Sequence, residues 1–204
     1  MKFFARLRVI QLAAVAIAAW VSVANAADPP AADAPTRDGH NVHRVEKYAH
    51  VAAFLNLGQG TVRIVAVVPT ASQSSLGVVD TLASMLEGTA SKRLRIYVIL
   101  RGGDDADSSL HAAVLAGRAS DPRIVYFWDP TGAVAQVWDT HDTSCAWLYD
   151  TSARFADQPP TASLVVVAAP PGKGLRLEGG ALRAQSRAMV RRVEAKMNQP
   201  GDGL

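Results

Sequence analysis

The feature that most constrains this chain is a run of mostly β-branched apolar residues at 62–68, which Pro69 ends. A short, nearly all-apolar run of this kind is typical of a central strand that is covered on both faces. Residues 94–100, 124–128 and 161–167 have similar patterns and predict three further strands. The chain is therefore expected to be built around a buried sheet.

Stretches with helical spacing of apolar residues alternate with these strands. They predict helices at 41–56, 76–86, from Asp107 or Ser108 to about 117, 133–138 and 184–197. Residues 139–158 are polar with aromatic islands and are expected to be irregular, whereas 175–178 should form a short hairpin partner closed by Gly179 and Gly180. The alternation predicts an α/β three-layer sandwich over 41–198, with a mixed central sheet flanked by helices.

The first 26 residues have the order of an export signal. Basic residues within the first eight precede an apolar run at 9–23, and Ala24-Asn25-Ala26 supplies a small-x-small cleavage signature. The alternative is a membrane anchor, but the run is short for the roughly 20 residues that a spanning helix needs. We expect a signal peptide at 1–26, no stable membrane span after cleavage, and a periplasmic or secreted protein. Residues 27–40, rich in Ala, Pro and Asp, are predicted to be a flexible linker, and 199–204 a disordered tail.

Charge excludes one class of partner. Three of the 21 Lys and Arg residues fall in the signal segment, so the remaining 18 equal the 18 Asp and Glu residues. A nucleic-acid partner, which needs a dense basic face, is therefore not expected.

Three stretches of the chain lie in a characteristic order. A strand, Pro69, a loop and a helix come first, Pro160-Thr161 before a β-branched strand comes second, and a Gly-rich turn before the last helix comes third. This order resembles the thioredoxin-like superfamily, especially its exported, redoxin-type branch, from about residue 62 to 197. Members of that family place Cys-x-x-Cys where the helix begins, because a helix N-terminus lowers the pKa of a thiol.

The corresponding loop of this chain carries serines in place of cysteines. Ser72 and Ser75 have the spacing of the motif, but serine exchanges no electrons and forms no disulfide. The resemblance therefore implies a degenerate motif. Capping of the helix is the favoured role for these serines, and Ser74 is an equally good cap.

Two further candidate binding residues come from the resemblance and its neighbourhood. Pro160 matches the proline that thioredoxins hold in cis beside the active site, where a backbone edge pairs with an extended peptide. An ordinary proline-rich loop is the alternative. Thr161 follows it, and Trp147 lines a groove if the 139–158 segment folds over the helix tip; otherwise it packs in the core.

Cys145 is the single cysteine of the chain. It is expected to be buried and inert, or else to form an intermolecular disulfide. Its neighbours His141 and Asp142 would activate it only if the imidazole reached the sulfur. His43 and His50, which could share a helix face, do not make a metal site without further ligands, so no metal and no cofactor are expected.

Two functions from different classes follow. The first is a non-catalytic module that binds an exported protein or peptide through Ser72, Ser75, Pro160, Thr161 and Trp147. The alternative is a thiol-dependent redox protein or sensor that acts through Cys145. A folded structural remnant is a third possibility, which the sequence leaves open.

Overall fold

One six-stranded mixed sheet forms the centre of the protein. The computed structural model describes residues 42–72, 74–87, 89–140, 143–167 and 179–198. The strands lie in the order β1-β4-β3-β2-β5-β6, and the first four are parallel to one another. β5 is antiparallel to β2, and β6 is antiparallel to β5. Their bounds are β1 Val42–Arg44, β2 Val62–Pro69, β3 Leu94–Arg101, β4 Ile124–Asp129, β5 Cys145–Tyr149 and β6 Leu164–Val167.

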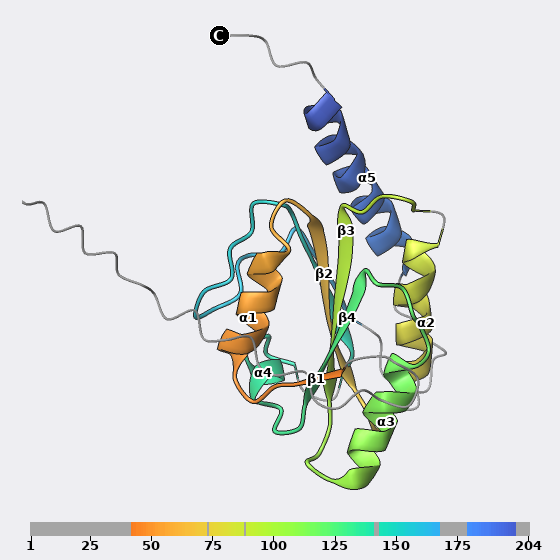
Figure 1. Cartoon of the computed structure of the whole chain (residues 1–204), viewed down its shortest axis with the longest axis vertical. Helices are drawn as coiled ribbons and strands as arrows, with labels where there is room; N and C mark the ends of the chain where they lie inside the picture. Colours follow the sequence, from red (N-terminus) through yellow and green to blue (C-terminus); the bar gives the residue numbers. More distant parts are fainter. Residues whose placement is uncertain (1–41, 73, 88, 141–142, 168–178, 199–204) are drawn as a thin grey trace, which may run out of the picture.

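Helices cover both faces of this sheet. On one face lie α1 (Tyr48–Leu57) and α4 (Ala133–Gln136); the other face is covered by α2 (Ser75–Leu86), α3 (Ala106–Ala116) and α5 (Gly179–Asn198) (Figure 1). The predicted fold class, an α/β three-layer sandwich with a mixed central sheet, is confirmed. No helix within the described residues is both long and apolar enough to cross a membrane.

Strand β2 shows why the sheet is covered on both sides. Its even positions, from Val62 to Val68, pack with α2, α3 and α5 in one core. The odd positions Val65 and Val67 pack with α1 and α4 in the other. Because successive side chains of a strand point to opposite faces, a nearly continuous apolar run is what a doubly covered strand requires.

The expectation that residues 139–158 are irregular was wrong at its centre. Residues 145–149, Cys-Ala-Trp-Leu-Tyr, form β5, and all five are buried between β2 and β6. A five-residue apolar run between Ser144 and Asp150 was the available signal, but its polar surroundings masked it.

Two helix predictions also need correction. The expected helix at 41–56 is divided: residues 42–44 form the edge strand β1 beside β4, and α1 begins at Tyr48. His43 therefore lies on a strand and shares no helix face with His50. Gly179 and Gly180 open α5 instead of closing a hairpin. The predicted signal peptide 1–26, linker 27–40, hairpin partner 175–178 and tail 199–204 lie outside the described residues.

Candidate functional site

The parallel strands β1 to β4 end at the same edge of the sheet. In open α/β sheets, ligands bind outside the carboxyl ends of the strands, so this edge is the first place to look for a site. It includes the β2–α2 loop with the serines, the β3–α3 loop with Asp104 and Asp105, and the turn after β4.

The serines of the β2–α2 loop bond to the loop itself. Ser75 is buried, and its hydroxyl donates a short hydrogen bond to the carbonyl of Pro69. The hydroxyls of Ser72 and Ser74 lie 2.8 Å apart, and the Ser74 amide points at Ser72 Oγ at 3.4 Å. The predicted capping role needs correction, since Ser74 is the N-cap residue of α2 by position but its side chain caps no amide. Ser72 and Ser75 close the loop onto the end of β2.

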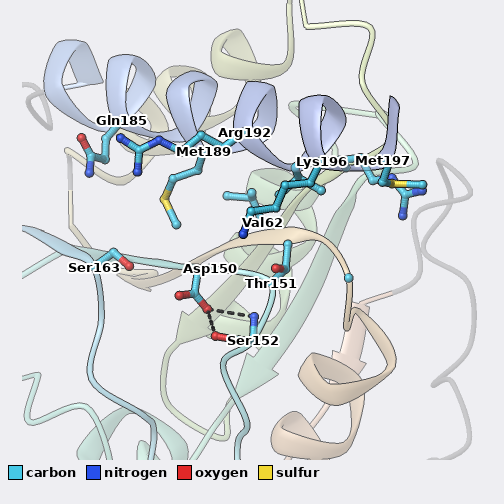
Figure 2. A pocket seen from close by; sticks show the side chains of 13 residues that line it. Val62, Asp150, Thr151, Ser152, Ser163, Gln185, Met189, Arg192, Lys196 and Met197 are labelled. Atoms are coloured by element: carbon cyan, nitrogen blue, oxygen red, sulfur yellow. Dashed lines mark hydrogen bonds between the residues drawn. The ribbon is translucent and has the colours of Figure 1, made fainter. Parts of the chain in front are cut away.

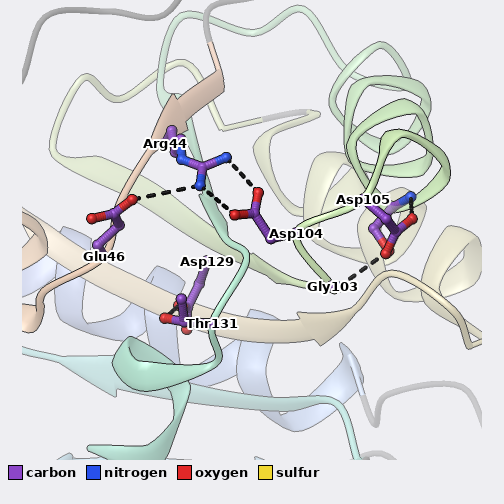
Figure 3. A network of polar contacts seen from close by, with 8 residues as sticks. Arg44, Glu46, Gly103, Asp104, Asp105, Asp129 and Thr131 are labelled. Atoms are coloured by element: carbon purple, nitrogen blue, oxygen red, sulfur yellow. Dashed lines mark hydrogen bonds and ion pairs between the residues drawn. The ribbon is translucent and has the colours of Figure 1, made fainter.

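Charged groups at the neighbouring strand ends are paired with one another (Figure 3). The Arg44 guanidinium donates to both oxygens of Asp104, at 2.8 and 2.9 Å, and lies over the ring of Trp128. These hydrogen bonds lower the pKa of Asp104. The interaction ties the end of β1 to the β3–α3 loop.

Two further acids of this edge, Asp105 and Asp129, serve helix ends. Asp105 caps α3, accepting the Ser108 amide at 2.8 Å, where Asp107 or Ser108 had been expected to cap. Asp129 is fully buried and accepts the Ala135 amide at 2.9 Å at the start of α4, while burial raises its pKa. Among the described residues, no group of His, Cys, Asp and Glu is arranged to hold a metal ion.

Cys145 lies near the same end of the sheet but on the opposite face from Ser75. It is opposite Val67 of β2 and Val167 of β6, and its side chain belongs to the core under α1 and α4. Burial raises the pKa of the Cys145 thiol. The predicted partners His141 and Asp142 lie outside the described residues.

Pro160 and the serines do not converge. The strand that lies directly beside β2 is β5, and Ser144 precedes it; Pro160 instead precedes β6, one strand further out. The Ser163 amide bonds to the carbonyl of Leu148, three residues or about 10 Å along β5 from Cys145. Pro160 thus lies toward the amino end of β2. Its peptide bond is trans, because the described residues contain no cis bond.

Trp147 packs mainly in the core. It is 9% exposed, lies opposite Val65 and Val165, and its ring centroid is 6.1 Å from that of Trp138. Trp138 in turn donates from Nε1 to the hydroxyl of Tyr149 at 3.0 Å. The segment after β5 does not cover the serine loop, because Asn56 of α1 exchanges two hydrogen bonds with the backbone of Phe155. This segment lies beside the C-terminal end of α1.

The surface that sequence reasoning missed is the outer edge of the sheet at β6. Within the part of the chain that the structure describes, β6 is the last strand in the sheet order, and two of its four residues, Val165 and Val167, are 50% and 57% exposed. Both lie opposite residues of the α1/α4 face, Trp147 and Cys145 respectively. An edge strand with exposed valines offers both backbone hydrogen-bonding groups and apolar area.

Comparison with known proteins agrees with this architecture. No protein-family model and no curated protein sequence matches the chain. The structure is similar to that of the hypothetical protein SMc02350 from Sinorhizobium meliloti 1021, with 18% identity over 68% of this chain and 74% of that one, and a TM-score of 0.50. It is also similar to a proposed thiol:disulfide interchange protein, DsbE, from Chlorobium tepidum (15% identity, 67% and 84% covered, TM-score 0.49). An uncharacterized conserved protein from Geobacillus kaustophilus gives 15% identity, 68% and 71% covered, and a TM-score of 0.46.

By its own strand order and connections, the fold is a thioredoxin-like three-layer sandwich. Four parallel strands joined by helices, followed by the antiparallel strands β5 and β6 and a last helix, carry this assignment. At such low identities the likeness shows a shared fold only. A shared fold does not establish a shared activity, because one fold hosts many activities. The activity must be argued from the site.

Proposed function

We propose that this protein is a non-catalytic binding module that takes up an extended peptide, or an extended segment of an exported protein, along the edge of β6. The observation that carries the proposal is the pair of half-exposed valines, Val165 and Val167, on the strand that ends the sheet. Strand addition supplies affinity through backbone hydrogen bonds and selectivity through alternate side chains.

The chemistry of the edge suggests what kind of peptide fits. Val165 and Val167 point to the same face of the sheet, where their cross-strand neighbours on β5 are Trp147 and Cys145. An added strand that places β-branched or aromatic side chains on this face would cover the valines and extend the apolar surface. Cross-strand pairs of this kind contribute roughly 0.2–1 kcal/mol each.

The state of the serines and of the lone thiol supports binding over redox catalysis. The chain has one cysteine, so a dithiol within it is impossible. We interpret Ser72 and Ser75 as the remnant of a cysteine motif whose hydroxyls now hold the loop closed. The alternative, thiol chemistry at Cys145, has less support because burial raises the pKa of this thiol and a reactive thiolate needs a lowered one.

The proposal is tested with decapeptides displayed on phage and selected on the full chain, followed by fluorescence titration of the selected peptide. Val165→Lys and Val167→Lys place a charge on the edge and should each weaken binding about fivefold or more. The matched control is Val114→Lys, since Val114 is 52% exposed on α3, a helix that packs beside β1 and β4 at the opposite end of the sheet order from β6. It should leave the affinity unchanged.

Cys145→Ser separates the two candidate functions. The binding module keeps its affinity for the selected peptide in this variant. Loss of peptide binding in Cys145→Ser, or equal weakening by Val114→Lys and Val165→Lys, would contradict strand addition at β6.

A further inference from the structure

A hollow in the surface lies at the opposite end of the sheet from the serine loop. Its cavity of about 580 Å³ lies between α5, the first residue of β2 and the turn after β5. Figure 2 shows Met189 and Lys196 pointing from α5 toward the strand that carries Val62, with Asp150 and Ser152 across from them. We call this the α5 groove; it is lined by Gly60, Val62, Arg93, Asp150, Thr151, Ser152, Ser163, Gln185, Met189, Arg192, Val193, Lys196 and Met197.

The floor of the α5 groove is apolar. Val62 is fully buried, and Met189 and Val193 pack against the same core. Met189, Val193 and Met197 follow one another at four-residue intervals, so they form a stripe along one side of α5. Met197 remains 60% exposed. Methionine side chains adapt to irregular apolar ligands because they are unbranched and flexible.

The rim of the groove is cationic and unpaired. Arg93, Arg192 and Lys196 line it, and within the described part of the chain none of the three has a carboxylate at ion-pair distance. Asp150 is the one acid among the lining residues, but its Oδ1 already accepts from Ser152 and from the Ala153 amide. The groove therefore combines an apolar floor with excess positive charge.

We propose that the α5 groove binds a single-chain amphiphile with an anionic head, of the class of medium-chain fatty carboxylates. The apolar chain lies on the stripe of Met189, Val193 and Met197, and the head lies among Arg93, Arg192 and Lys196. A cavity of this size is in the range of small-molecule sites, and a few charged groups beside an apolar floor fix the orientation of such a ligand. This inference concerns a different surface from β6 and does not depend on the peptide-binding proposal.

Isothermal titration of the full chain with monomeric decanoate tests the proposal. We expect saturable binding, with decanol and acetate each binding at least about fivefold more weakly, because each lacks one of the two recognised parts. The double variant Arg192→Gln/Lys196→Gln should weaken decanoate binding about fivefold, since it removes two of the three cations that line the rim.

The matched control lies on the same helix. Arg187→Gln/Arg191→Gln removes the same charge from α5, but neither residue lines the groove. It should leave decanoate binding within about twofold of the unsubstituted chain. Absence of saturable decanoate binding, equal binding of decanol, or equal weakening by the two double variants would each overturn the proposal.

Discussion

Replacing Arg63 by Met should destabilise the protein more than any surface substitution. Arg63 lies on β2 and is fully buried, with its guanidinium over the ring of Phe155. It donates to the carbonyls of Leu55 at the end of α1, and of Asp150 and Ala153 in the connection from β5 to β6, at 2.8–2.9 Å. Burial lowers the pKa of Arg63, because desolvation in the core disfavours the charged form of the guanidinium.

The magnitude follows from these three acceptors. Leaving a buried carbonyl without its donor costs about 1–3 kcal/mol, but the bonds to Asp150 and Ala153 are only part-buried, so water replaces some of the loss. Replacing a buried cation by an apolar side chain also removes the free-energy cost of desolvating the charge, which offsets part of the loss. We therefore expect Arg63→Met to lower the free energy of unfolding by about 2–4 kcal/mol and the urea midpoint by roughly 1–2 M.

Urea unfolding followed by tryptophan fluorescence measures this effect. Arg95→Met is the matched control, because Arg95 lies next to Arg63 in the sheet register but is exposed on β3. Its effect should stay within about 0.5 kcal/mol. If the two variants were equally stable, the carbonyl network would not hold the β5–β6 connection in place.

Three further predictions concern the serine loop, an ion pair and the thiol. Ser75→Ala should cost about 1–2 kcal/mol in urea unfolding because it leaves the Pro69 carbonyl without its donor, whereas Ser72→Ala should cost about 0.5 kcal/mol or less; the reverse order would contradict the loop geometry. The Arg123 guanidinium lowers the pKa of Asp121 in the folded state, so this carboxylate stabilises the fold above its unfolded pKa and the contribution is lost as pH falls through the folded value. Asp121→Asn should then cost about 1 kcal/mol at pH 7 and less as the pH falls below the unfolded pKa of the carboxylate, and a cost that does not change with pH would refute the assignment. Cys145 should react with an aromatic disulfide reagent at pH 7 far more slowly in the native than in the urea-unfolded protein; equal rates would show that the thiol is accessible.

The central strands were predictable because burial on both faces forces a residue pattern that few other structures share. β2, β3 and β4 begin at the predicted residues and end within one residue of the predictions, and the loop with Ser72 and Ser75 lies where the strand–Pro–helix pattern put it. β1 was not predictable in the same way, since residues 42–44 become a strand only by pairing with the edge of β4.

The missed strand β5 explains the main error about the site. With residues 139–158 taken as irregular, Pro160 was matched to the proline that thioredoxins hold beside the active site, which would have placed it near the serines. In the structure β5 takes that place and Ser144 precedes it. The β6 edge and the α5 groove had no sequence signal, because each depends on segments far apart in the chain: the sheet order leaves β6 at the end, and α5 meets the start of β2 only in the folded protein.

Hydrogen exchange of the selected peptide complex, measured on the unsubstituted chain and on Cys145→Ser, tests the central claim most directly. A module that captures an extended peptide along its outermost strand predicts slower amide exchange at Val165 and Val167 when the peptide is bound, to the same extent in both proteins. Exchange at β6 that the peptide leaves unchanged, or protection that disappears with the thiol, would contradict the account.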